Sequence, residues 1–198
     1  MRTVELMGRP KQFDPETAVN EAMEVFWRKG YSATTPQDLV DALGIGKGSL
    51  YNAFGSKQEL FWRALRRYRE SQTAALVDAL EKPGPVRARL RSALLGIVEM
   101  DTADPTHRGC MAVNTAAELA DTDQEATALV RRMLDTIEDA FRMVIEEGQR
   151  TGEIASDRDS AAIGSMLTNT VAGMRVVARV ADGPHRLERV VDATIEAL

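Results

Sequence analysis

The chain has 198 residues, of which 44% are hydrophobic, and its formal net charge is −5. This length and apolar fraction can bury one core or two small ones, which excludes a disordered chain. The single cysteine, Cys110, excludes an internal disulfide. There is neither a signal segment at the start nor an 18-residue uncharged apolar run, so we expect a cytoplasmic protein that does not cross a membrane.

The charge is unevenly distributed along the chain. Residues 1–69 hold 11 Lys and Arg against 8 Asp and Glu, whereas residues 70–198 hold 14 against 22. A basic first third on an acidic body is typical of a nucleic-acid-binding segment, although ordinary fluctuation also explains an asymmetry of this size. The periodicity is helical throughout, with few aromatics and no alternating β-rich runs, so we expect an all-α fold.

The first predicted elements are a basic arm and a helix. Residues 1–13 form the arm, in which Arg9 and Lys11 could enter a DNA minor groove; the alternative is a solvated tail. Asp14 then caps a helix that begins at Pro15 and is closed by Lys29 and Gly30.

Two short helices with a tight turn are predicted between residues 35 and 54. Thr35 and Asp38 begin the first helix, and Gly44 ends it in a left-handed conformation. The second helix spans Lys47 to Phe54, and Gly55 ends it. We call residues 47–54 the reader helix.

The outward face of the reader helix carries small, basic and hydrogen-bonding side chains. This face suits the DNA major groove: Lys47 for a phosphate or guanine, Tyr51 for a phosphate, and Ser49 and Asn52 for base edges, with Gly48 allowing close approach. The pattern therefore predicts a helix-turn-helix, although a helical hairpin whose polar face meets only water would have the same spacing.

The run GSLYNAFGSKQELF, with GRPK before the first helix and ALGIGKG leading in, resembles the signature of the TetR family of bacterial transcription regulators. The resemblance covers roughly residues 9 to 65. It implies DNA contacts at the following positions, with Thr35 near a phosphate: Gln37, Lys47, Gly48, Ser49, Tyr51, Asn52 and Lys57, the last exposed on the next helix. Gly46 and Ala53 stand where the family often has Ser or Thr and commonly has His, so one cap and one phosphate contact are missing.

Further helices are predicted along the rest of the chain, beginning with a long one from Ser56, capped with Glu59, to about Leu80. After a break at residues 82–85, the expected helices are 86–100, 109–119, 122–150 with a cap at Thr122, one capped by Asp157 and running to about 181, and 185–198. The predicted division is a DNA-binding domain at 1–55, a connecting helix at 56–80, and a ligand-binding and dimerisation domain at 81–198.

We find no catalytic or cofactor site in the sequence. The two histidines, His107 and His185, stand apart beside predicted loops, GIGKGS lacks the spacing of a phosphate-binding loop, and no metal-ligand cluster is present. We therefore expect neither an enzyme nor a bound cofactor or metal.

The resemblance implies a ligand pocket among the middle helices. Methionines suit adaptable apolar pockets but also serve as core filler, and polar residues on apolar helices need partners, which can be each other. The candidates are Met100, Cys110, Met111, Asn114, Glu118, Met143, Met166, Asn169 and Arg175.

Dimerisation is expected from the last two helices. Two apolar stripes could form a four-helix interface across a twofold axis, or they could face the core of their own domain. The residues are Ile163, Leu167, Val171, Leu187, Val190, Val191 and Ile195.

Cys110 allows two interpretations. Next to Arg108 and near a helix start, its thiol would be activated as a sensor of electrophiles or oxidants; in the apolar surroundings of Met111 it would be an inert buried side chain.

Our interpretation is a homodimeric regulator that binds a palindromic operator in double-stranded DNA, a repressor released by an unknown small molecule. The alternatives are a helical interaction module that does not bind DNA and a thiol-based repressor that acts through Cys110.

Overall fold

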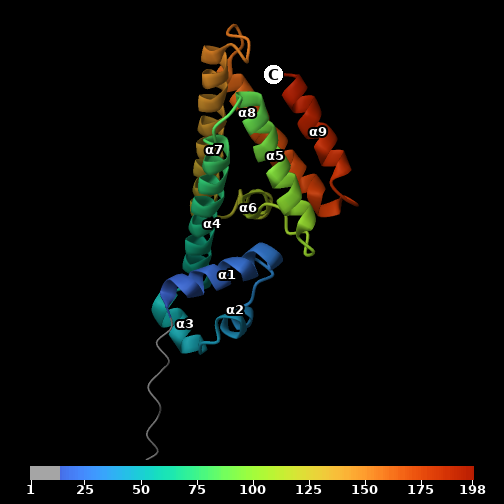
Figure 1. Ribbon diagram of the computed structural model, residues 1–198. Coiled ribbons are helices and arrows are strands. Elements are labelled where there is room, and N and C mark those ends of the chain that lie inside the picture. The colour runs from blue at the N-terminus through green and yellow to red at the C-terminus, as the bar shows by residue number, and fades with distance from the viewer. Residues whose placement is uncertain (1–13) are drawn as a thin grey trace, which may run out of the picture.

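The computed structural model describes residues 14–198, and this part of the chain is helical with no strand. Figure 1 shows three short helices at one end and two long helices, α4 and α7, that run side by side away from them. The elements are α1 (Pro15–Lys29), α2 (Pro36–Leu43), α3 (Lys47–Phe54), α4 (Lys57–Leu80), α5 (Val86–Ala103), α6 (Met111–Leu119), α7 (Gln124–Thr151), α8 (Ser160–Val177), the short 3-10 helix η1 (Ala178–Val180) and α9 (His185–Glu196).

The first helices begin and end where their local signals predict. The Asp14 side chain accepts a hydrogen bond from the backbone N–H of Thr17 at 3.0 Å, and Thr35 and Asp38 form a reciprocal capping box at the start of α2. Gly44 adopts the left-handed conformation at φ 61°, so the chain turns there into α3. The Ser56 side chain accepts from Glu59 N–H and begins α4.

Several later boundaries differ from the prediction by one to three residues. Asp123 rather than Thr122 caps α7, and the Asp123 carboxylate also accepts from Trp62 Nε1 at 3.0 Å. Asp159 rather than Asp157 caps α8. The α5 helix continues past Met100 to Ala103 and includes Asp101, which forms a buried ion pair with Arg175.

Two hydrophobic cores fill the molecule. Core 1 lies among α1 to α4, α6 and the first half of α7; core 2 lies among the end of α4, α5, the second half of α7, α8 and α9. Core 1 therefore joins the three short helices to part of the predicted second domain, across the expected boundary at residues 80–81. In the described part of the chain, no helix is long and apolar enough to span a bilayer.

Candidate nucleic-acid interface and the contacts behind it

The α3 helix is held on the molecule by two apolar side chains. Leu50 and Phe54 are buried against core 1. Gly48 and Asn52 lie on the opposite side and are exposed, and Lys47 is exposed as the first residue of the helix. A Cβ added at Gly48 would meet nothing within 4 Å. Ser49 and Tyr51 are half-buried beside them. Figure 1 shows α3 at one end of the molecule, and the expected side chains of the reader helix are exposed or half-buried there.

Three other predicted DNA-contacting side chains are engaged within the protein. Lys57 is half-buried, not exposed as expected, because its ammonium donates to the carbonyls of Tyr31 and Thr34, each at 2.9 Å, and lies over the Tyr31 ring. Thr35 is exposed but its hydroxyl belongs to the α2 cap. The exposed Gln37 amide donates to Asp41 at 2.7 Å. Arg9 and Lys11 lie outside the described residues.

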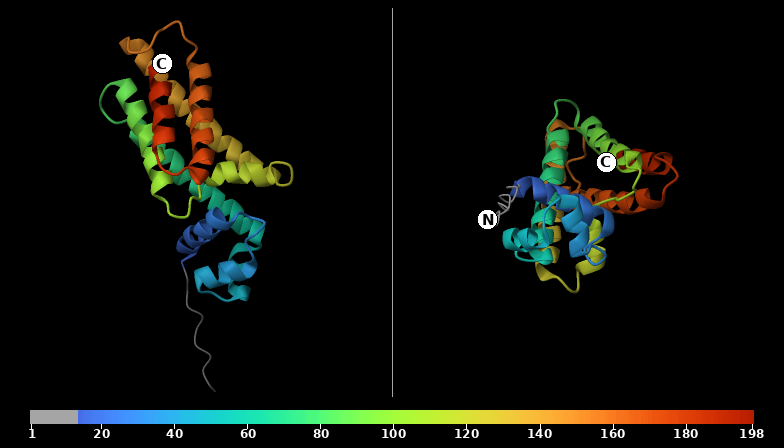
Figure 2. Two further views of the ribbon diagram at one scale, coloured as in Figure 1. Left: turned by 90° about the vertical axis from the view of Figure 1, so that its right-hand side faces the viewer. Right: turned by 90° about the horizontal axis from the view of Figure 1, so that it is seen from below.

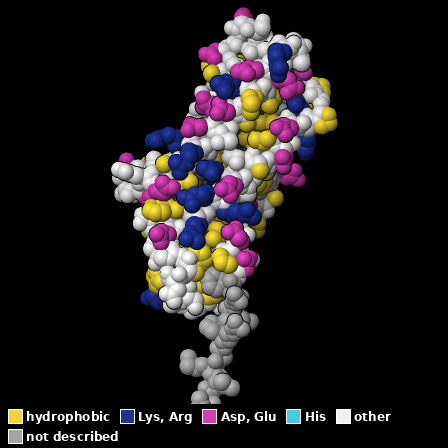
Figure 3. Space-filling view, turned by 90° about the vertical axis from the view of Figure 1, so that its left-hand side faces the viewer, with side chains coloured by type: hydrophobic (Ala, Val, Ile, Leu, Met, Phe, Trp, Pro, Cys, Tyr) yellow, Lys and Arg dark blue, Asp and Glu magenta, His cyan; other side chains and the backbone are white. Residues whose placement is uncertain are grey.

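The positive charge of the first third does not lie on the body of the helix-turn-helix. Residues 14–55 hold three Lys and Arg against six Asp and Glu, whereas residues 57–69 at the start of α4 hold five against one. Figure 3 shows Lys and Arg side chains gathered across the middle of one face, interleaved with acids. Arg66 pairs with Glu125 at 3.3 Å, for example. A simple basic patch therefore does not explain DNA binding here, and individual contacts from α3 become more important.

The α6 helix contacts the turn between α1 and α2 through Glu118. Its carboxylate accepts from the backbone N–H groups of Tyr31 at 3.0 Å and Ser32 at 2.6 Å. Burial raises the pKa of Glu118, but the hydrogen bonds from Ser32 and Tyr31 outweigh it, so the pKa is lowered and the charged form is favoured. Gly30, at φ 78°, allows this approach, since a Cβ there would lie 2.8 Å from a Glu118 oxygen. Glu118 thus makes an interdomain contact, and it also lines a surface pocket beside Gly30.

A second contact joins α1 to the loop before α6. Trp27 Nε1 donates to the Gly109 carbonyl at 2.9 Å, and the Arg108 guanidinium lies 4.1 Å above the Trp27 ring. Asn114 supports this loop by donating to the Arg108 carbonyl at 2.9 Å. Asn114 is therefore part of the interdomain contact, and it lines a surface pocket there together with Trp27 and Arg108.

A buried polar network lies between the two cores. Arg175 of α8 is 5% exposed and makes a two-pronged ion pair with Asp101 of α5, with both N–O distances at 2.9 Å. It also donates to the Tyr68 hydroxyl at 3.3 Å and to the Gly109 carbonyl at 3.4 Å, the same carbonyl that Trp27 contacts. One side chain thus connects α8, α5 and α4 to the loop that touches α1.

The charges in this network are settled by burial and proximity. Burial alone would lower the pKa of Arg175, but Tyr68, Cys110 and Asp101 raise it, so the guanidinium is charged. Burial raises the pKa of Tyr68 well above its usual value, so its hydroxyl is neutral and donates to Cys110 Sγ at 3.4 Å. Cys110 itself is 6% exposed within core 1.

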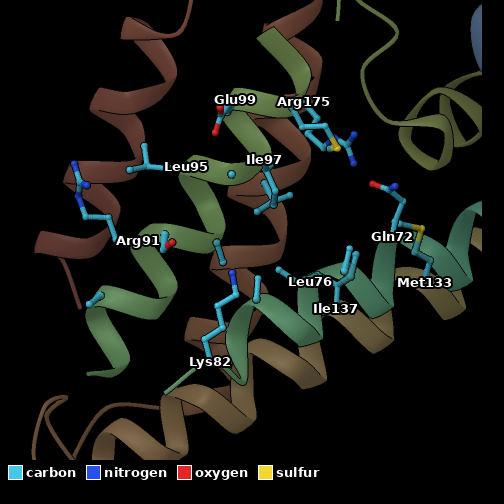
Figure 4. Close-up of a pocket in the computed structure, with 18 residues that line it drawn as sticks. Gln72, Leu76, Lys82, Arg91, Leu95, Ile97, Glu99, Met133, Ile137 and Arg175 are labelled. Carbon is cyan, nitrogen blue, oxygen red and sulfur yellow. The ribbon is translucent and has the colours of Figure 1, made fainter. Parts of the chain in front are cut away.

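A cavity of about 650 Å³ opens between α4 and α5, with α7 and α8 contributing side chains to it (Figure 4). Its walls include Leu76, Leu95, Ile97, Met133 and Ile137, and Gln72 and Lys82 also line it. Small side chains on the facing helices leave the space open. They are Ala75, Ala79, Ala88, Ser92 and Gly96.

Two of the nine predicted pocket residues, Met100 and Arg175, line this cavity. Cys110 and Met111 are instead buried in core 1, and Met143, Met166 and Asn169 are exposed elsewhere on the surface. The sequence signal that was missed is the run of small residues at helical spacing on α4 and α5. It indicates room between two helices only if those helices are known to face each other.

Most residues predicted at the dimer interface are already buried within the protomer, as the alternative interpretation of these stripes expected. They are Ile163, Leu167, Val171, Leu187 and Val191, at 0 to 7% exposure, whereas Val190 is 37% exposed and Ile195 is half-buried. A different set faces outward. On α8 it comprises Ala162, Met166, Asn169, Gly173 and Val176, and on α9 it comprises Val190, Ala193 and Ala197; we call these eight residues the outer stripe.

Two family models match the chain: "Bacterial regulatory proteins, tetR family" over residues 18–64 and "Tetracyclin repressor-like, C-terminal domain" over residues 87–194. An uncharacterized HTH-type transcriptional regulator, YezE of Bacillus subtilis (strain 168), is 32% identical over 97% of this chain and 100% of its own. The HTH-type transcriptional repressor ComR of Escherichia coli (strain K12) is 29% identical, over 95% and 90%.

Solved structures with the same fold include one bound to DNA. A cysteine mutant of the TetR family transcriptional regulator CifR, complexed with a 26-bp double-strand operator, superposes with a TM-score of 0.85 at 29% identity. The match covers 96% of this chain and 99% of that one.

Proposed function

Since this chain belongs to the TetR family of DNA-binding transcriptional regulators, we propose that it is a homodimeric repressor whose α3 helices read a palindromic operator and which a small molecule releases. The observation that carries the operator-reading part is the exposed surface of α3, where Lys47 and Asn52 are exposed and Tyr51 is half-buried while Leu50 and Phe54 are buried. A lysine and a tyrosine hydroxyl suit phosphates, and an asparagine amide suits the edge of an adenine.

The test is a binding assay on DNA flanking the protein's own gene, at two salt concentrations and with bulk competitor DNA. We expect Lys47→Ala and Tyr51→Phe to weaken binding to every sequence, and Asn52→Ala to relax preference at particular base pairs by about 1 to 3 kcal/mol. Arg150→Ala, at the far end of α7, is the control and should change neither. Wild-type binding that bulk DNA abolishes would favour the interaction module that does not read DNA.

The dimer is proposed to form through the outer stripe. Along α8 these residues follow one another at alternating spacings of four and three, the seam of a helix that packs against another helix. Figure 2 shows α8 and α9 side by side on one flank, so two protomers could bring four helices together. Gly173 lies mid-stripe, and a Cβ added there meets nothing within 4 Å in the protomer.

Gly173→Glu tests this interface without disturbing the protomer. We expect a monomer in sedimentation with unchanged helical content, because charges that face each other across the twofold axis would repel. Asp157→Lys, away from the stripe, is the control. A Gly173→Glu protein that remains a dimer would place the interface elsewhere.

We propose that a ligand in the cavity causes release of DNA by acting on Arg175. This side chain lines the cavity and contacts the Gly109 carbonyl, which also accepts from Trp27 of α1. A ligand that displaces Arg175 would therefore alter the seat of the helix-turn-helix and the spacing of the two α3 helices.

A second candidate function is thiol sensing through Cys110, and the observation in its favour is the hydrogen bond from the Tyr68 hydroxyl to its sulfur. Modification of Cys110 would disturb the same Tyr68 and Arg175 network. The test is DNA release by a quinone, an aldehyde or peroxide, with Cys110→Ser for comparison. Release in the wild type alone would establish the sensor; equal behaviour would leave reversible ligand binding.

A further inference from the structure

We infer that the α4–α5 cavity takes an amphipathic carboxylate, with the carboxylate at Lys82 and an extended hydrocarbon body along the groove. This inference rests on the proposed release by a small molecule and specifies its chemical class. A cavity of about 650 Å³ is of the size that holds a small organic ligand.

The charges that line the cavity are not equivalent. Arg91 pairs with Asp192 of α9 at 2.7 Å and is directed away from the cavity in Figure 4. Arg175 is committed to Asp101, Tyr68 and the Gly109 carbonyl. The Lys82 backbone carbonyl accepts from Arg89 at 3.4 Å, but the Lys82 ammonium makes no hydrogen bond or ion pair with the described part of the chain. Figure 4 shows this ammonium directed into the space between α4 and α5. The free charge at that end is therefore positive.

Among the described residues, Glu99 is the one carboxylate that lines the cavity, and it lies at the other end of the groove. It is thirteen residues beyond Val86, the first residue of α5, which corresponds to about 20 Å along the helix. An amine at that end would meet Glu99, whereas an anion at the α4–α5 connection would meet Lys82. The two ligand classes therefore bind in opposite directions and can be distinguished.

The walls between these ends are apolar. Leu76, Leu95 and Ile97 come from α4 and α5, and Met133 and Ile137 come from α7. Methionine adapts to ligands of varied shape, and an apolar wall favours a hydrocarbon over a polar body. The Gln72 amide, which has no protein partner in the described residues, offers a hydrogen bond within the groove.

This orientation also places the hydrocarbon where it can act on the network. Met133, Ile137 and Val171 line the cavity together with Arg175. A body that fills this end presses on Arg175 without replacing its ion pair with Asp101. The carboxylate therefore contributes binding affinity, and the hydrocarbon changes the position of Arg175.

The experiment measures direct binding by calorimetry without DNA, with decanoate, decan-1-ol and decylamine below micelle-forming concentrations. We expect decanoate to bind about tenfold more tightly than the alcohol, a difference of about 1.4 kcal/mol. Lys82→Met, which removes the charge and is one atom shorter, should abolish that difference. Arg91→Met is the matched control, because this cation lines the same cavity but is directed away from it, and it should preserve the difference.

Gly96→Leu tests the groove itself. A Cβ at Gly96 meets nothing within 4 Å, so the leucine should fold normally and occupy the space of the hydrocarbon. We expect it to abolish binding of all three probes with an unchanged melting temperature.

Three outcomes would overturn the inference: equal affinity for acid and alcohol, preference for the amine, or no binding of any probe to the wild type. A separate measurement of DNA release distinguishes its failure from that of the proposed function. Decanoate that binds through Lys82 but does not release DNA would leave the inference standing and would contradict ligand-controlled release.

Discussion

The two hydrophobic cores of this protein are built from different side chains. Among the described residues, core 1 contains Phe26, Phe54, Phe61 and Tyr68 as buried residues, with three more aromatics packed against them, whereas Phe141 is the one aromatic of core 2. In core 1 the rings contact one another: the Phe26 and Phe61 centroids lie 5.1 Å apart, and those of Trp27 and Tyr68 lie 4.9 Å apart. Core 2 is aliphatic and adjoins the open cavity.

The difference in side chains suits the two cores to different functions, support of the DNA-binding helix and binding of a ligand. Ring contacts hold α1 and α4 in one geometry, and Phe54 packs α3 into the same core. A helix that must fit a DNA groove requires such a fixed support. Aliphatic side chains around an open groove can adjust to a ligand at lower cost. Arg175 and its partners lie between the two cores, so a structural change in one core can alter the packing of the other. The predictions below test this contrast.

Truncating one side chain in each region should show the contrast most strongly. Phe61→Ala should lower the free energy of unfolding by about 3 to 5 kcal/mol, because it removes a fully buried ring. Ile97→Ala should cost about 1 kcal/mol or less, because Ile97 is half-buried beside the cavity. Urea unfolding of both variants is the measurement. Equal losses would mean that the cavity wall is as tightly packed as core 1.

Breaking the ion pair between Arg175 and Asp101 should lower the free energy of unfolding by about 3 kcal/mol or more. Arg175→Met leaves the 5% exposed Asp101 carboxylate without its partner, and an uncompensated buried charge is strongly destabilising. The double variant Arg175→Met, Asp101→Leu should recover most of the lost stability, because no charge remains. If single and double variants unfold at the same urea concentration, the ion pair is not what matters.

Removing the charge of Glu118 should cost about 1 to 2 kcal/mol. Glu118→Gln weakens charge-assisted hydrogen bonds to Tyr31 and Ser32 and places an amide N–H₂ against one of those donors. Operator affinity should fall as well, because α6 no longer holds the turn before α2. Glu99→Gln, an exposed carboxylate on α5, should change stability by less than about 0.5 kcal/mol.

The smallest expected effect is an acid dependence confined to the start of α2. Hydrogen bonds from Lys29 and Thr35 lower the pKa of Asp38 from 3.8 to about 2. A lowered pKa means that this stabilisation is present above about pH 4 and is lost as the pH falls towards 2. Asp38→Asn should therefore be less stable than the wild type at neutral pH, with a difference that shrinks between pH 4 and 2. Thermal melts across that range measure it, and a constant difference would contradict the assignment.

The sequence alone determined the all-α class, the family resemblance, the three helices of residues 15–54 and the outward face of the reader helix. These features depend on neighbours three or four residues away: the Thr35 and Asp38 capping box, the left-handed Gly44, and the pair Leu50 and Phe54 on one side of α3. Such signals act before the chain packs, so they can be read without knowing what lies opposite.

Only the tertiary structure decided which face of each later helix is inside. On α8 both the stripe of Leu167 and Val171 and the stripe of Met166 and Val176 have helical spacing, and the sequence does not say which one meets the protomer's own core. Lys57 looked like a free cation until the turn at residues 31–34 was placed against it. The cavity, likewise, comes from two helices that face each other with small residues between them. In each case the deciding partner is distant in sequence, and local periodicity carries no information about it.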